Sequence, residues 1–184
     1  MIVSFGPADW VTSIRAALVI ALAVMLVRPP DPMLCVAIGA IAAVLDGVDG
    51  WIARRTRTAS TFGARFDMET DALLVLVLSA LVWRYGKAGG WVVASGLMRY
   101  AFVWAGLAWT WLQRPLEPSR RRQTVCVVQI GALLVSLLPW VEHPSSAAMA
   151  AAGLAVLGWS FLVDILWLWR WRALRPLFSS STPR

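Results

Sequence analysis

Long apolar runs that contain no charge are the feature that most constrains the fold of this chain. Residues 16–27, 72–82 and 125–141 contain no Asp, Glu, Lys or Arg. Of the 184 residues, 59% are hydrophobic and 15% are charged, against about 45–50% and about 25% in water-soluble domains. This composition excludes a disordered chain, and two cysteines are too few for a disulfide scaffold. It predicts an all-α, polytopic membrane protein.

Six segments are long and apolar enough to be predicted as transmembrane helices, in a single domain that covers residues 1–184. Helix-breaking residues separate them, for example Pro29, Pro30 and Pro32 after the first segment. That segment is interpreted as a span and not as a signal peptide, because no small-residue cleavage site follows it. The predicted spans are 10–27, 33–54, 66–83, 90–112, 124–141 and 147–169.

Arginine is distributed unequally between the two sides of these spans. Twelve arginines lie in the second connection, the fourth connection and the C-terminal tail, whereas the opposite side has only Arg28, Arg84 and Lys87. Because basic loops remain in the cytoplasm, both termini are predicted to be cytoplasmic and the protein to lie in the cell membrane. The net charge of +7 then reflects orientation and anionic lipid headgroups, and it does not predict nucleic-acid binding.

Half of the acidic residues gather within 26 positions, at the predicted cytoplasmic ends of the second and third spans. Asp46 and Asp49 share one helix face, and Asp67 and Asp71 share another, while Glu69 points away and is expected to be solvated or paired with a loop. Side by side, the two faces would gather four carboxylates. Each close pair would repel by about 4 kcal/mol at an effective dielectric constant of about 20, so cations are needed. Oxygen ligands favour Mg²⁺, Mn²⁺ or Ca²⁺.

The spacing of these aspartates resembles the motif of the CDP-alcohol phosphotransferase family, also called the CDP-alcohol phosphatidyltransferase family. The motif in this sequence is Asp46-Gly-Val-Asp49-Gly50-Trp-Ile-Ala53-Arg54, eight residues, Gly63, three residues, Asp67, three residues and Asp71. Every fixed position of the family motif is present at its spacing. The resemblance covers the second and third spans closely and the six-helix layout loosely.

This resemblance implies an enzyme of phospholipid biosynthesis with its active site at the cytoplasmic ends of the helices. Family members transfer a phosphatidyl or similar group from a CDP-linked donor to an acceptor hydroxyl and release CMP. The resemblance thus implies CDP-diacylglycerol as donor, two divalent cations (Mg²⁺ or Mn²⁺) as cofactors, and a homodimer. It implies that the four aspartates bind the metals, that Asp71 is also the general base, and that the nucleotide pocket is lined by Gly50, Ala53, Arg54 and Gly63.

A second element in the first span is Asp9-x-x-Thr12-x-x-Arg15. It resembles the family's Asn-x-x-Thr-x-x-Arg element near the nucleotide, which implies nucleotide binding by Thr12 and Arg15, with Asp9 in place of the Asn. The alternative is an ordinary helix start, in which Asp9 is the N-cap and Arg15 extends toward the membrane surface.

Four further arginines are candidates for binding the acceptor. Arg99 lies within a span, where it should face a cavity or a carboxylate, and Asp164 is a possible partner for Arg99 or for another arginine. A structural ion pair and acceptor binding both remain open for Arg99. Arg120, Arg121 and Arg122 form either an ordinary cytoplasmic loop or a binding site for a phosphate-bearing acceptor.

The abundance of arginine favours a phosphorylated polyol as acceptor, such as glycerol 3-phosphate or an inositol phosphate. Serine, choline or a phosphatidylglycerol acceptor of the cardiolipin type remain alternatives. A divalent-cation transporter is a rival of another class, but it predicts carboxylates near mid-bilayer on several helices. A catalytically silent assembly protein is the second rival, and it would tolerate loss of the aspartates.

Overall fold

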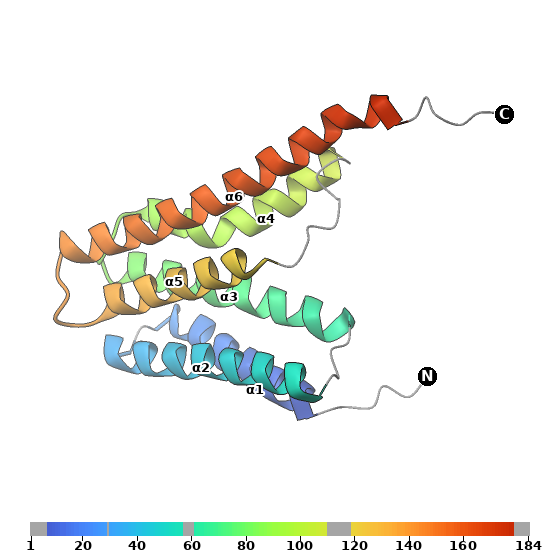
Figure 1. Cartoon of the computed structure of the whole chain (residues 1–184). Coiled ribbons are helices and arrows are strands. Elements are labelled where there is room, and N and C mark those ends of the chain that lie inside the picture. Colours follow the sequence, from blue (N-terminus) through green and yellow to red (C-terminus); the bar gives the residue numbers. More distant parts are fainter. Residues whose placement is uncertain (1–6, 29, 57–60, 110–118, 179–184) are drawn as a thin grey trace.

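The computed structural model describes residues 7–28, 30–56, 61–109 and 119–178, with side chains described for 11–28, 30–48, 66–109 and 119–170. Within these ranges every regular element is a helix (Figure 1). The elements are α1 (Pro7–Met25), α2 (Pro32–Thr56), α3 (Thr61–Arg84), the 3-10 helix η1 (Gly90–Val93), α4 (Ala94–Ala108), α5 (Arg120–Leu137) and α6 (Ser145–Phe178).

Helix α3 lies at the centre of the bundle. It packs against α1, α4 and α5, while α2 packs against α1 and α5, and α6 packs against α5 and α4 (Figure 1). Leu74, Leu78 and Leu81 of α3 are completely buried. At Gly96 of α4 the two helices approach so closely that an added Cβ would lie 2.3 Å from the Cα of Leu76. The central helix is therefore held on several sides, which fixes the direction of the side chains that it presents.

The helices alternate in direction, so their ends gather at two opposite ends of the bundle (Figure 1). The turns 26–28, 85–89 and 138–144 lie at one end, which we call the Lys87 end. At the opposite end α2 finishes and α3 and α5 begin. Because Asp46, Asp67 and Asp71 lie toward it, we call it the carboxylate end.

The helices differ from the predicted spans mainly at their ends. Helix α5 is shifted by four residues toward the N-terminus relative to the predicted span 124–141. It finishes at Leu137 because Leu138 precedes Pro139, and the residue before a proline is driven out of the helical conformation. The predicted span 90–112 begins as a 3-10 turn and its helix finishes at Ala108, whereas the predicted span 147–169 is continued by α6 to Phe178.

Two described stretches are long and apolar enough to cross a membrane. They are Gly90–Ala108 and Ser145–Arg170, with mean hydropathies of 1.3 and 1.9. Val11–Met25 and Pro32–Val48 are shorter apolar helices. Only 22% and 17% of the two longer stretches is buried inside the protein, and Trp104 of α4 has 74% of its surface exposed. Apolar surface of this extent is expected where helices face lipid and not water.

Candidate functional site

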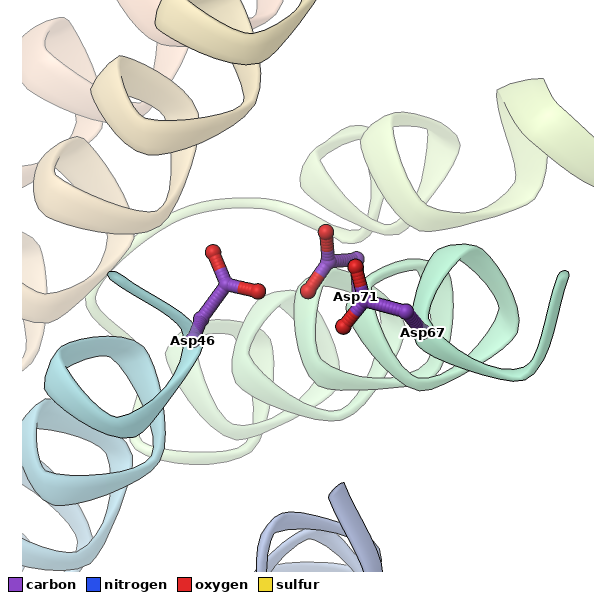
Figure 2. Close-up of side chains that lie close together, drawn as sticks. All are labelled: Asp46, Asp67 and Asp71. Atoms are coloured by element: carbon purple, nitrogen blue, oxygen red, sulfur yellow. The ribbon is translucent and has the colours of Figure 1, made fainter. Parts of the chain in front are cut away.

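Three carboxylates from two helices converge at the carboxylate end (Figure 2). We call this set the carboxylate cluster: Asp46 of α2, and Asp67 and Asp71 of α3. One carboxylate oxygen from each residue lies within 4.8 Å of the other two. Asp67 and Asp71 share a face because they are four residues apart on a helix. The side chains are 25%, 40% and 23% exposed, so the cluster is accessible from outside the protein.

A guanidinium from a third helix lies among these carboxylates. Nη1 of Arg15, on α1, is 2.9 Å from Oδ1 of Asp46 and also pairs with Asp67, while Nη2 donates a hydrogen bond to Asp71. The Arg15 side chain is completely buried, and its Nε has no hydrogen-bond partner within the described residues. One guanidinium thus faces three carboxylates. Within the part of the chain whose side chains are described, this excess of negative charge favours the binding of further cations.

The cluster fits a small divalent cation by its chemistry. It offers only oxygen ligands, which Mg²⁺ and Mn²⁺ prefer to nitrogen or sulfur. Ligands on opposite sides of a Mg²⁺ ion are about 4.2 Å apart, since each lies at about 2.1 Å. Oxygens that lie within 4.8 Å of one another are therefore close to the spacing that such an ion requires.

Several predicted site residues lie outside the residues whose side chains the structure describes. Asp49, Gly50, Ala53 and Arg54 belong to the last part of α2, and Gly63 belongs to the first turn of α3. Their backbone is helical and close in sequence to the carboxylate cluster. Their roles as metal ligand and as lining of the nucleotide pocket stay predictions.

The first helix contributes a buried polar face. Thr12 is 6% exposed and Arg15 is fully buried, and three residues on a helix place side chains on neighbouring positions of one face. Helix α1 begins at Pro7, so Asp9 lies inside its first turn and is not the N-cap. The alternative interpretation of Arg15 is also wrong, because its buried guanidinium pairs with the half-buried carboxylates of the cluster instead of reaching toward the membrane surface.

Comparison with known proteins agrees with the motif on α2 and α3. The family model for CDP-alcohol phosphatidyltransferase matches residues 6–165. This chain belongs to the CDP-alcohol phosphatidyltransferase family. It is 28% identical over 145 residues to the CDP-diacylglycerol--glycerol-3-phosphate 3-phosphatidyltransferase of Salmonella typhimurium, which covers 75% of this chain and 74% of the relative.

Two further relatives carry the same name. The protein of Escherichia coli (strain K12) is 27% identical over 146 residues, 76% of this chain and 75% of its own length. The protein of Pectobacterium atrosepticum is 43% identical over a shorter stretch of 54 residues, 29% of this chain and 30% of its own length.

Two of the predicted acceptor-binding arginines of this phosphatidyltransferase family member form ion pairs within the protein. Arg99 of α4 pairs with Glu69 of α3, and Arg121 of α5 pairs with Asp164 of α6. Nη1 of Arg121 also donates to the carbonyl of Ser160 at 3.3 Å. The expectation that Arg99 faces a carboxylate is confirmed. Asp164 pairs with another arginine, Arg121, which is the second of the two options for it, and not with Arg99. Glu69 is 50% exposed, which agrees with the expected solvated side chain, but its partner lies on helix α4 and not in a loop.

The other two predicted acceptor-binding arginines lie in the first turn of α5. Arg120 is exposed, and Arg122 is partly buried. The backbone N–H groups at the start of a helix are not used within the helix and favour anions. The start of α5 therefore combines a helix N-terminus with three consecutive arginines.

Gln129 is a buried polar side chain of this family member that is not among the predicted site residues. Gln129 of α5 is completely buried, and neither its Oε1 nor its Nε2 has a hydrogen-bond partner within the described residues. It lies against α6, where a Cβ added to Gly153 would be 2.6 Å from its Oε1. The signal that could have identified it is an amide side chain inside the charge-free run 125–141.

An apolar groove of about 540 Å³ lies between α4 and α6 of this family member. Its lining includes Met98, Phe102, Trp109, Phe161 and Ile165, and no residue of the lining is charged. A groove of this composition supplies no group for phosphoryl transfer. The carboxylate end, where Asp46, Asp67 and Asp71 converge, is therefore the candidate site.

Proposed function

We propose that this chain is a multi-pass membrane enzyme that transfers the phosphatidyl group of CDP-diacylglycerol to glycerol 3-phosphate and releases CMP. The observation that carries this proposal is the convergence of Asp46, Asp67 and Asp71 from two helices. The choice of glycerol 3-phosphate is supported by the names of relatives that align over three quarters of this chain.

The proposed placement in the membrane follows from the apolar surface of the helices. All six α-helices would cross the bilayer, including the shorter apolar helices Val11–Met25 and Pro32–Val48. The carboxylate end would face the cytoplasm, because the arginine-rich connections adjoin it. The acyl chains of the donor would then stay in the bilayer while its cytidine is bound from water.

The proposed reaction is a displacement at phosphorus. The acceptor hydroxyl oxygen forms a bond to the phosphorus that carries diacylglycerol, and the bond from this phosphorus to the bridging oxygen breaks. CMP leaves with that oxygen, and Asp71 takes the proton of the acceptor hydroxyl. The four aspartates (Asp46, Asp49, Asp67 and Asp71) would hold two divalent cations, Mg²⁺ or Mn²⁺. When bound, these cations neutralise charge on the attacking and leaving oxygens.

The proposed binding groups surround this cluster. The nucleotide would contact two residues of α1, Thr12 and Arg15. It would also contact the region of Gly50, Ala53, Arg54 and Gly63. The arginines at the start of α5 would bind the phosphate of the acceptor, because a helix N-terminus and arginine both favour phosphate. The ion pair between Arg121 and Asp164 supports this by holding Arg121 in one position.

The test is CMP release from CDP-diacylglycerol in the presence of Mn²⁺ or Mg²⁺. Asp71→Asn should lower turnover by about 100-fold or more, since a positioned general base contributes about 10²–10⁴-fold. Asp31→Asn is the matched control at the Lys87 end. Asp31 Oδ1 accepts a hydrogen bond from the N–H of Met33 at 3.0 Å, which an amide oxygen also accepts. Undiminished turnover in Asp71→Asn would remove Asp71 from the role of base.

The acceptor is tested with a panel of glycerol 3-phosphate, an inositol phosphate, serine and phosphatidylglycerol. We expect glycerol 3-phosphate to give the fastest CMP release. Faster release with serine or phosphatidylglycerol would contradict the proposed acceptor and leave the reaction class intact. No CMP release with any acceptor, from a folded chain supplied with metal, would contradict the reaction class.

A further inference from the structure

We infer that Arg15 is a resident counter-cation, which holds the carboxylate cluster together without metal and gives up the carboxylates when a divalent cation binds. This inference rests on the proposed function, because it takes the cluster to be the metal site. It assigns to Arg15 a step that precedes nucleotide binding, and it predicts that arginine and metal compete.

The first argument is the way in which Arg15 joins three helices. Its side chain extends from α1 to Asp46 on α2 and to Asp67 and Asp71 on α3. Both terminal nitrogens are engaged, and Nη1 is shared by two carboxylates. Without this guanidinium, three neighbouring carboxylates would repel one another. Among the residues whose side chains are described, Arg15 is therefore a cation that helps α2 and α3 to bring the cluster together.

The second argument is that a metal ion needs the same carboxylates. The oxygens that pair with Arg15 are Oδ1 of Asp46, Oδ1 of Asp67 and Oδ1 of Asp71. An ion bound at about 2.1 Å from these oxygens would lie next to the guanidinium nitrogens and repel them. Each carboxylate has a second oxygen, Oδ2, but an ion bound there would still lie close to the guanidinium and repel it. Metal binding should therefore weaken the contacts between Arg15 and the cluster.

The third argument concerns what a released Arg15 can do. A guanidinium pairs with phosphate by two parallel hydrogen bonds, and Arg15 is one helical turn from Thr12 on the face directed at the site. In the described part of the site three carboxylates outnumber one guanidinium, and these groups together repel a diphosphate. Metal adds positive charge and frees Arg15 at the same time. The donor should therefore bind after the metal.

The test is calorimetric titration of the metal-free, full-length protein with Mn²⁺. Arg15→Gln should bind Mn²⁺ about tenfold more tightly than the wild type, because it has no charged hydrogen bonds to give up. Arg15→Lys should lie between the two, since one ammonium cannot span three carboxylates as a guanidinium does. Arg99→Gln is the matched control for Mn²⁺ affinity, because it removes an arginine paired with Glu69 outside the cluster. Its Mn²⁺ affinity should equal that of the wild type.

A second readout is the melting temperature. Metal-free Arg15→Gln should melt below the wild type, and Mn²⁺ should raise its melting temperature more than it raises that of the wild type. CDP should bind the wild type more tightly with Mn²⁺ than without, and this gain should be smaller in Arg15→Gln. Equal CDP affinity with and without Mn²⁺ would overturn the order of binding.

The outcomes separate this inference from the proposed function. Unchanged or weaker Mn²⁺ binding in Arg15→Gln would overturn the inference, if the wild type binds Mn²⁺ and Asp71→Asn does not. Failure of the wild type itself to bind Mn²⁺ would instead contradict the proposed metal site. If Arg15→Gln does not fold, Arg15→Lys decides, and Mn²⁺ affinity at or below that of the wild type would overturn the inference.

Discussion

At the Lys87 end one ammonium group is surrounded by backbone carbonyls, whereas at the carboxylate end one guanidinium faces three carboxylates. Nζ of Lys87 donates to the carbonyls of Leu138, Pro139 and Val141 at 3.1, 3.3 and 2.7 Å. The hydroxyl of Ser146 donates in turn to the carbonyl of Lys87 at 2.6 Å. These contacts join the turn after α3 to the turn between α5 and α6.

The comparison shows two arrangements of partly buried charge in one helix bundle. The ammonium group of Lys87 donates to three neutral carbonyls of the turn between α5 and α6, and these hydrogen bonds stabilise this end of the bundle. The charge at the carboxylate end is left in excess, with Asp67 still 40% exposed. Such an arrangement costs stability when empty and gains it when a cation arrives. Stability and function are thus assigned to opposite ends of the same helices.

The largest effect should come from the carboxylate end. Asp67→Asn should lower CMP release by roughly 100-fold or more and raise the Mn²⁺ concentration needed for half-maximal turnover. Mutation of residues that only hydrogen-bond to a metal ligand already lowers metal affinity or activity by about 10–100-fold, and Asp67 is a proposed ligand itself. Steady-state CMP release at increasing Mn²⁺ measures both quantities. Turnover within twofold of the wild type at every Mn²⁺ concentration would mean that Asp67 is not part of the metal site.

Substitution at the Lys87 end should affect stability and spare the chemistry. Lys87→Met should lower the free energy of unfolding by about 2–3 kcal/mol, because it removes a charged donor and leaves three carbonyls without it. Reversible unfolding of the detergent-solubilised protein in SDS measures the change. CMP release per folded molecule should stay at the wild-type level.

The matched control for Lys87→Met is Arg84→Gln, since Arg84 is an exposed basic residue only three positions away. It should leave the unfolding curve nearly unchanged. Equal destabilisation by both substitutions would show that positive charge at this end matters and that the three carbonyl contacts do not.

Close packing near the Lys87 end gives an intermediate effect. Gly96→Ala should destabilise the protein by about 1–3 kcal/mol, because the new Cβ would meet the backbone of Leu76 on the central helix. Gly131→Ala is the matched control on α5, where an added Cβ meets nothing within 4 Å. It should be neutral or stabilise by up to about 1 kcal/mol, because alanine favours the helix. The opposite order of the two melting temperatures would contradict the packing of α4 against α3.

The smallest effect concerns a single neutral hydrogen bond. The hydroxyl of Tyr85 donates to the carbonyl of Pro30 and lies 3.5 Å from Sγ of Cys35. Tyr85→Phe should therefore lower the free energy of unfolding by about 1 kcal/mol. Cys35→Ser, which keeps a polar group near the same hydroxyl, should change it less. A loss equal to that of Lys87→Met would mean that this tyrosine is as important to the end as the lysine.

Helix positions and the carboxylate residues could be predicted from the sequence because both depend on local periodicity. Charge-free runs mark the helices, and the interval of four between Asp67 and Asp71 places them on one face whatever the rest of the fold does. The end of α5 is set by a different local rule, the effect of Pro139 on the residue before it. The predicted span 124–141 extends past this proline because residues 138–141 are apolar.

The partners of the arginines could not be predicted, because they depend on how the helices rotate against one another. The sequence leaves open whether Asp164 pairs with Arg99 or with another arginine; in the structure α4 presents Arg99 to Glu69 of α3, and Asp164 pairs with Arg121. Arg15 was assigned to the nucleotide on resemblance alone. Its contact with three carboxylates depends on α1 packing against both α2 and α3, which no pattern within α1 encodes.

The central claim, that the carboxylate cluster binds a divalent cation, is tested most directly by electron paramagnetic resonance of Mn²⁺ added to the metal-free protein. The wild type and Asp31→Asn should remove free Mn²⁺ from solution saturably and equally. Asp46→Asn, Asp67→Asn and Asp71→Asn should each weaken this binding by about tenfold or more, which is about 1.4 kcal/mol. Binding of Mn²⁺ that is unchanged in all three variants would contradict the account.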